Sequence, residues 1–197
     1  MQKSPENRLD QQFCQEIIRA FNSICETLGP NSEGAVITRG QDSKFFCTGL
    51  DLEECERNPN ANADGFYPLL HTILDFPLPT IALVTGHTFG AGCPLAFAHD
   101  YRIMNSRRGF MCMPPVDLGC ISRGGKEALQ DGLVDAIAEP EDMLLVAVEL
   151  ARKWAPKAKA GVYGLLGSEL RGEMSRSLQQ ISYVHSRSTF SPGISKI

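Results

Sequence analysis

The chain has 197 residues, of which 43% are hydrophobic and 21% are charged, and its formal net charge is −4. This length suits one globular domain with a substantial core. Without a basic stripe or a long apolar run, the sequence argues against a nucleic-acid partner, an anionic membrane surface and a membrane span. The seven cysteines are scattered without the spacing of a zinc site, so we expect free thiols and no metal.

The first part of the chain alternates predicted helices with predicted strands. Apolar residues at helical spacing predict an amphipathic helix over residues 10–28, and the apolar run at 34–39 predicts a buried strand. A turn then leads into a short helix that Asp51 is expected to cap. Another helix is predicted over 63–76, with Pro68 in its first turn.

The rest of the chain continues this alternation. The β-branched run 79–85 predicts a strand buried on both faces, and Pro94 suits the first turn of the short helix that follows. Further elements are expected as strands at 101–105 and 109–113, a helix, turn and strand over 125–139, a helix over 139–155, and a helix within the last forty residues before a Ser-rich tail. Strands alternating with helices predict an α/β fold.

Three glycines, Gly86, Gly90 and Gly92, follow the strand predicted at 79–85. Glycine suits sharp bends and close backbone approach, and the start of a helix offers N–H groups that attract an anion. The loop lacks the lysine of a phosphate loop and the dinucleotide spacing, which favours the oxygen of a reacting acyl group. The alternative is that the glycines only allow a helix to pack tightly on a strand. A similar loop at 44–54 offers a second N–H donor.

Four segments occur in the order of known family signatures. They are KFFCTGLDL (44–52), PTIALVTGHTFGAGCPLAFAHDYRIM (79–104), FMCMPPVDLG (110–119) and GLVDAI (132–137). Together they resemble the crotonase, or enoyl-CoA hydratase/isomerase, superfamily, and are most similar to its peroxisomal enoyl-CoA delta isomerase branch. The resemblance implies a crotonase-like spiral of ββα units over residues 1–155 and a helical C-terminal region over 156–197. It also implies an acyl-CoA substrate, no cofactor apart from the coenzyme A of that substrate, and a homo-oligomer, either a trimer or a hexamer.

The resemblance implies a binding site for the thioester. By motif match, the backbone N–H groups of Leu50 and Ala91 form an oxyanion hole that stabilises a thioester enolate. The same match places Asp51, Leu52 and Gly90 beside the substrate. The implied reaction is enoyl-CoA isomerisation or hydration, in fatty-acid degradation or in the biosynthesis of a specialised acyl product.

The positions that move protons in the family differ in this chain. The two glutamate positions of relatives match Pro94 and Pro115, and a third position used in related isomerases matches Arg123. Neither proline nor arginine accepts a proton near neutral pH. An acyl-CoA binder without activity, or an inactive subunit of an oligomer, is therefore the alternative function.

Other residues are candidates for the missing base. Asp117 lies two positions after the second proline and is the leading candidate, with Glu127 and His87 as further ones. Cys93, at a helix start, is a candidate nucleophile for a different reaction class. His99 is expected to be structural.

Two further predictions concern the length of the segments between the motifs and the last three residues. The stretch between Gly119 and Gly132 is shorter than in the family, and so is the N-terminus. The final residues, Ser195, Lys196 and Ile197, have the form of a peroxisomal targeting tripeptide, which predicts a peroxisomal location and an import receptor as a partner.

Overall fold

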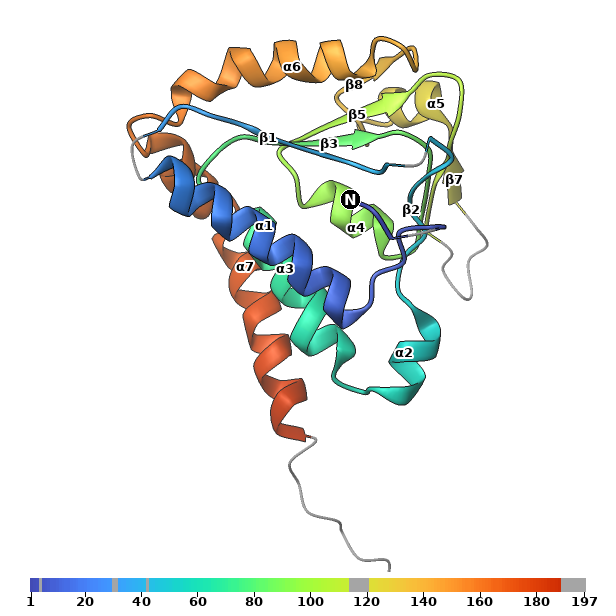
Figure 1. The fold of residues 1–197 in the computed structure, drawn as a ribbon, viewed down its shortest axis with the longest axis vertical. Coiled ribbons are helices and arrows are strands. Elements are labelled where there is room, and N and C mark those ends of the chain that lie inside the picture. The colour runs from blue at the N-terminus through green and yellow to red at the C-terminus, as the bar shows by residue number, and fades with distance from the viewer. Residues whose placement is uncertain (4, 30–31, 42, 114–120, 189–197) are drawn as a thin grey trace, which may run out of the picture.

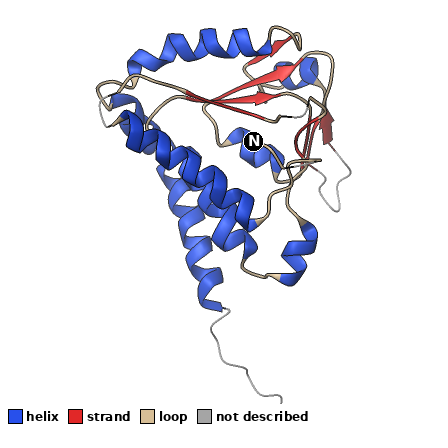
Figure 2. Cartoon of the chain, in the orientation of Figure 1, coloured by secondary structure: helices blue, strands red, loops and turns tan. Residues whose placement is uncertain are grey.

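The computed structural model describes residues 1–3, 5–29, 32–41, 43–113 and 121–188. The described strands form two four-stranded sheets (Figure 2). The first sheet is parallel and has the order β1 (Val36–Arg39), β3 (Thr80–Val84), β5 (Tyr101–Asn105) and β8 (Ala136–Ala138). The second has the order β2 (Phe45–Cys47), β4 (His87–Phe89), β6 (Met111–Met113) and β7 (Ile121–Arg123), with only the last pair antiparallel. The α/β class is confirmed.

Helices cover both faces of the first sheet. The described helices are α1 (Gln11–Leu28), α2 (Leu52–Arg57), the π-helical turn η1 (Asn62–Phe66), α3 (Tyr67–Leu74), α4 (Gly92–Phe97), α5 (Gly125–Gln130), α6 (Met143–Trp154), the 3-10 turn η2 (Ala155–Lys157) and α7 (Val162–Ser188). Figure 1 shows α6 along one face of this sheet, and α1, α3 and α4 on the other side. The long helix α7 packs against α3 and extends away from the sheets.

Local side chains explain where several helices begin. The Asp10 carboxylate accepts a hydrogen bond from the N–H of Phe13 at 2.7 Å and caps α1. Asp51 caps α2 in the same way by accepting from the N–H of Glu54 at 3.1 Å, as predicted. Pro68 lies in the first turn of α3, where its missing N–H costs no helical hydrogen bond.

The main core lies between the first sheet and the helices α1, α3 and α4. All five residues of β3 are buried, which confirms the prediction for this strand. Phe21 of α1 meets Phe76 edge to face, with ring centroids 4.9 Å apart, and Leu69, Ile73 and Leu95 are fully buried around them. Burial of these side chains holds the helical layer on the sheet and so fixes the position of α4.

The helix α7 packs on α3 with polar side chains. Ser168 donates to Asp75 at 2.9 Å, and the Ser175 hydroxyl lies 2.6 Å from Nδ1 of His71. In contrast, Leu166 and Leu170 of α7 are 59% and 85% exposed. The exposed side of this helix therefore carries large apolar side chains as well as charged ones. In the described part of the chain, no helix combines the length and apolar character that crossing a membrane requires.

Candidate functional site

The loops that lead into α2 and α4 meet at one edge of the second sheet. Strands β2 and β4 pair in parallel, so both chains leave the sheet at the same edge. The contact is close, since a Cβ built on Gly49 would lie 3.2 Å from the amide nitrogen of Ala91. The structure thus brings together the two loops that the sequence pattern singled out.

Each glycine of the loop before α4 has a physical reason. A Cβ on Gly92 would lie 2.4 Å from the carbonyl oxygen of Cys47, and one on Gly86 would lie 2.2 Å from that of Lys44. Gly86 allows the chain to pass close to the residue before β2. Gly92 allows α4 to pack directly on β2, which confirms the packing interpretation for this glycine. Gly90 differs, because its φ is +50° and the space around it is open. Its left-handed backbone turns the chain into α4.

In the described part of the chain, the N–H groups of Leu50 and Ala91 have no backbone acceptor. Leu9 pairs with the first loop: its N–H donates to Gly49 at 2.8 Å, and its carbonyl accepts from Asp51 at 2.9 Å. These hydrogen bonds involve the residues on both sides of Leu50 but not the N–H of Leu50 itself. Within the described ranges, neither Leu50 nor Ala91 donates a backbone hydrogen bond. Two such donors in adjoining loops can bind an oxygen that gains negative charge.

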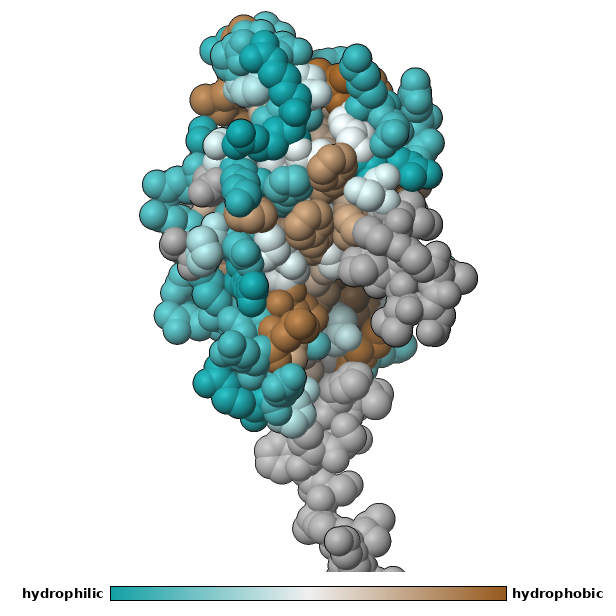
Figure 3. Space-filling model, turned by 90° about the vertical axis from the view of Figure 1, so that its right-hand side faces the viewer, coloured by the Kyte–Doolittle hydropathy of each residue, from teal (hydrophilic) through white to brown (hydrophobic). Residues whose placement is uncertain are grey.

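The other expected binding residues border these loops. Asp51 is engaged as the cap of α2, and its second carboxylate oxygen lies 3.7 Å from Nζ of Lys3. Leu52, the first residue of α2, is 67% exposed. Figure 3 shows the side of the molecule that carries α2 and β7, where hydrophobic side chains lie along the middle, beside a hydrophilic left margin.

The structure describes some of the residues considered as the base, and the contacts of these residues differ. Asp117 and the neighbouring Pro115 lie outside the described residues. The Glu127 carboxylate accepts from the N–H of Gly124 at 3.1 Å and caps α5, so it has a structural role. Arg123, on β7, forms an ion pair with Asp131.

His87 lies among aromatic rings. Its ring centroid is 5.8 Å from that of Phe45, 5.4 Å from that of Phe89 and 5.5 Å from that of Phe110. Along β4, His87 and Phe89 share one face of the strand, whereas the buried Thr88 points to the other. The Nδ1 atom of His87 is buried and has no hydrogen-bond partner in the described part of the chain, so this packing provides no group that would orient His87 as a base.

Cys93 is a structural thiol. It is buried at the start of α4, and its Sγ donates to the carbonyl of Thr88 at 3.4 Å. Burial raises its pKa to about 11, so the thiol stays protonated near neutral pH. The nucleophile hypothesis is therefore wrong.

The cysteines shown as free are Cys14, Cys25, Cys47, Cys55 and Cys93. Cys112 takes part in a disulfide, which corrects the expectation of free thiols for that residue.

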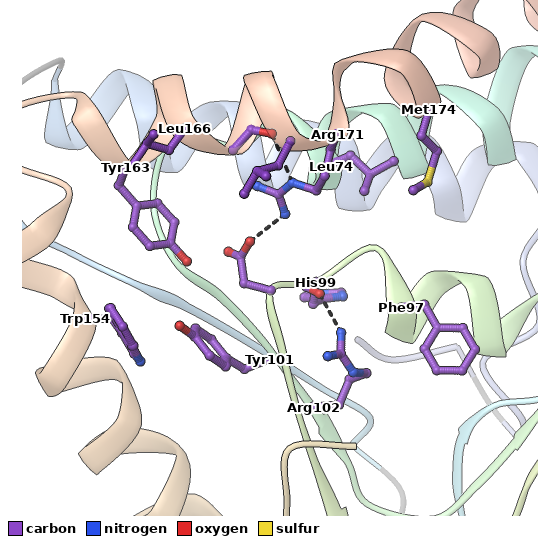
Figure 4. A pocket seen from close by; sticks show the side chains of 13 residues that line it. Leu74, Phe97, His99, Tyr101, Arg102, Trp154, Tyr163, Leu166, Arg171 and Met174 are labelled. Carbon is purple, nitrogen blue, oxygen red and sulfur yellow. Dashed lines mark hydrogen bonds and ion pairs between the residues drawn. The ribbon is translucent and has the colours of Figure 1, made fainter. Parts of the chain in front are cut away.

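A separate cavity of ≈ 530 Å³ lies at the opposite end of α4, between α7, α6 and the start of β5 (Figure 4). It is bordered by Phe97, the last residue of α4, whereas Ala91 is the N-cap of the same helix. Sequence reasoning missed this cavity, because five elements contribute to it and none has a local pattern that indicates a ligand.

Comparison with known proteins identifies the family. A sequence profile described as enoyl-CoA hydratase/isomerase matches residues 1–125. The chain is 32% identical over 148 residues to the peroxisomal enoyl-CoA delta isomerase 1 of Arabidopsis thaliana, covering 74% of this chain and 61% of that protein. It is 28% identical over 205 residues to the peroxisomal enoyl-CoA delta isomerase 2 of the same plant, covering 84% and 85%.

The fold agrees with this assignment. A solved enoyl-CoA hydratase from Mycobacterium ulcerans superposes with a TM-score of 0.81 at 20% identity, covering 95% of this chain and 92% of that one. The chain spans less than two thirds of the first Arabidopsis relative and most of the second. The ordered motifs, the two sheets with their helical C-terminal region and the profile match agree: this chain belongs to the enoyl-CoA hydratase/isomerase family of the crotonase superfamily.

Proposed function

We propose that this protein binds an acyl-CoA thioester, holds its carbonyl oxygen between the N–H groups of Leu50 and Ala91, and acts as an enoyl-CoA isomerase or hydratase. The observation that carries the proposal is the meeting of the two loops at Gly49 and Ala91, with both donors left without a backbone partner among the described residues. Relatives named enoyl-CoA delta isomerase support the same chemistry.

The proposed mechanism is the stabilisation of an enolate. When a base removes a proton from the α-carbon of the thioester, negative charge moves to the carbonyl oxygen. Each backbone donor stabilises that charge, and the loss of one such donor typically costs about 3 kcal/mol in the transition state. Asp117 is the proposed base, because a carboxylate there lies two positions from Pro115, where relatives carry their glutamate.

The alternative function is acyl-CoA binding without turnover, alone or as a subunit of an oligomer. One observation favours it: Pro94, at the other glutamate position, is built into the first turn of α4. Its ring leaves no proton-accepting group there. This alternative uses the same two donors and differs only in the proton step.

Proton exchange separates the two functions. We expect the purified protein, incubated with a 3-enoyl-CoA in deuterated water, to incorporate deuterium at the α-carbon and to release the conjugated 2-enoyl product. Binding of the thioester without exchange would favour the inactive binder. Failure to bind any acyl-CoA would overturn both proposals.

Substitution of Ala91 tests the donor itself. Its φ is −61°, close to the value of about −65° that proline imposes, so Ala91→Pro removes the N–H without requiring a change of φ at this position. We expect exchange to slow by about 100-fold with an unchanged thermal midpoint. Ala91→Gly keeps the N–H and is the matched control.

Asp117→Asn is expected to abolish exchange while thioester binding persists, and an active variant would exclude Asp117 as the base.

The proposal includes a cellular location and an assembly. The tripeptide Ser195 to Ile197 is proposed to bind the peroxisomal import receptor, and the names of the Arabidopsis relatives support this. A fluorescent protein fused ahead of this chain is expected in peroxisomes, and in the cytosol once the tripeptide is deleted.

A homo-oligomer, either a trimer or a hexamer, is proposed by resemblance. The proposed pathway is either fatty-acid degradation or specialised acyl-CoA biosynthesis. Sedimentation velocity tests the assembly.

A further inference from the structure

The cavity at the far end of α4 has the properties of a small-molecule site. Its volume of ≈ 530 Å³ lies within the range of about 300–1,000 Å³ typical of ligand pockets. Most of its lining is apolar: Leu74, Phe97, Trp154, Leu166, Leu170 and Met174. Several of these side chains are well exposed, including Leu166 at 59% and Leu170 at 85%. An apolar ligand would cover them.

The charged groups of the cavity are already paired. Arg171 forms an ion pair with Asp100, and Arg102 forms one with Asp135 at 2.9 Å. His99, also on the lining, is buried and hydrogen-bonded through both ring nitrogens, so it offers no further polar atom. A charged ligand would therefore enter an apolar space without a counter-ion, at a considerable desolvation cost. The cavity favours an uncharged ligand.

Aromatic rings and unpaired hydrogen-bond donors define the chemistry further. Tyr101 and Trp154 stack with centroids 5.6 Å apart and an interplanar angle of 21°. Figure 4 shows both at one end of the cavity with Tyr163, and Phe97 and Met174 at the other end. Arg171 lies between, and uses Nη1 for Asp100 and Nε for a backbone carbonyl. Its Nη2 has no hydrogen-bond partner in the part of the chain that is described, and the same holds for Nε of Arg102 and Nε1 of Trp154.

From these observations we propose that the cavity binds an uncharged aromatic molecule that carries a carbonyl oxygen. The aromatic ring packs against the Tyr101 and Trp154 end, and the oxygen accepts a hydrogen bond from Nη2 of Arg171. This site is separate from the proposed thioester site, because Ala91 and Phe97 lie at opposite ends of α4. The proposal therefore does not depend on turnover.

The chain offers a direct optical test, since Trp154 is its only tryptophan. The probe is prodan, an uncharged naphthalene with a ketone carbonyl, which absorbs where tryptophan emits and shifts to the blue in apolar surroundings. We expect saturable quenching of Trp154 emission together with blue-shifted prodan emission. The sulfonated naphthalene ANS is expected to bind at least about 10-fold more weakly, because its charge finds no counter-ion.

Two adjacent leucines supply matched variants. Leu166 lines the cavity, whereas Leu165, at 72% exposure on the same helix, does not. Leu166→Asn should weaken prodan binding by about 10-fold, since it removes apolar contact area, and Leu165→Asn by less than about twofold. Both side chains are exposed, so neither change is expected to alter folding. Circular dichroism verifies this.

Three results would overturn the proposal. Absence of saturable quenching would mean that the cavity does not take the probe. Equal binding of ANS would show that the paired charges do not exclude an anion. If light scattering showed that Leu166→Asn dissociates an oligomer that Leu165→Asn leaves intact, the cavity would be an interface between copies of this chain instead.

Discussion

At the scale of single residues, His99 illustrates how burial determines a protonation state. Its Nδ1 bonds the carbonyl oxygen of Leu95 and its Nε2 bonds the hydroxyl of Thr38, both at 2.9 Å. With Nδ1 as the donor and Nε2 as the acceptor, this arrangement requires the neutral ring. Burial lowers the pKa of His99 to about 4 from its ordinary 6.5. The structural role expected for this residue from the sequence is confirmed.

The lowered pKa of His99 predicts a pH-dependent stability. Below pH 6.5 the unfolded chain binds a proton that the folded chain takes up only near pH 4, so acid favours unfolding across this window. We expect this residue to remove about 3 kcal/mol from the free energy of unfolding between the two pH values. Urea titrations of the wild type and of His99→Gln at several pH values measure it. Equal pH slopes in the two proteins would contradict the prediction.

At the scale of elements, the contact between α4 and β2 depends on the absence of a side chain. Gly92→Ala places a methyl group 2.4 Å from a backbone oxygen of β2, which cannot move aside without shifting the strand. We expect a loss of about 3 kcal/mol in the free energy of unfolding. Gly90→Ala is the matched control, because its surroundings are open and only its positive φ is strained, at about 1 kcal/mol. Equal losses for the two variants would contradict this explanation.

The elements also differ in how well the sequence predicts them. The helix α1 and the strand β3 have a strong apolar pattern, and the features at Asp51 and Pro68 are local, so residues a few positions away determine them. The strands β2, β4 and β7 have three residues each, too few for a pattern, and they exist through pairing with distant segments. The sequence did not predict β4, which lies between the glycines of the loop.

At the scale of the whole molecule, the two proposed sites also differ in how well the sequence predicts them. The loops of Leu50 and Ala91 could be predicted, because a turn glycine before a helix start is visible in a short stretch of sequence. The cavity near Trp154 could not, because it forms only when α3, α4, β5, α6 and α7 come together. A TM-score of 0.81 at 20% identity makes the same point, since the arrangement of elements persists when most side chains differ.

The helix α4 joins the two sites, because its N-cap, Ala91, belongs to one and its last residue, Phe97, to the other. Six helical residues span only about 9 Å, so the two proposed sites share one short element. Thermodynamic linkage then imposes a symmetry. By whatever factor prodan changes the affinity for an acyl-CoA, that acyl-CoA must change the affinity for prodan by the same factor. The effect of each ligand on binding of the other therefore measures the same coupling free energy between the two ends of this helix.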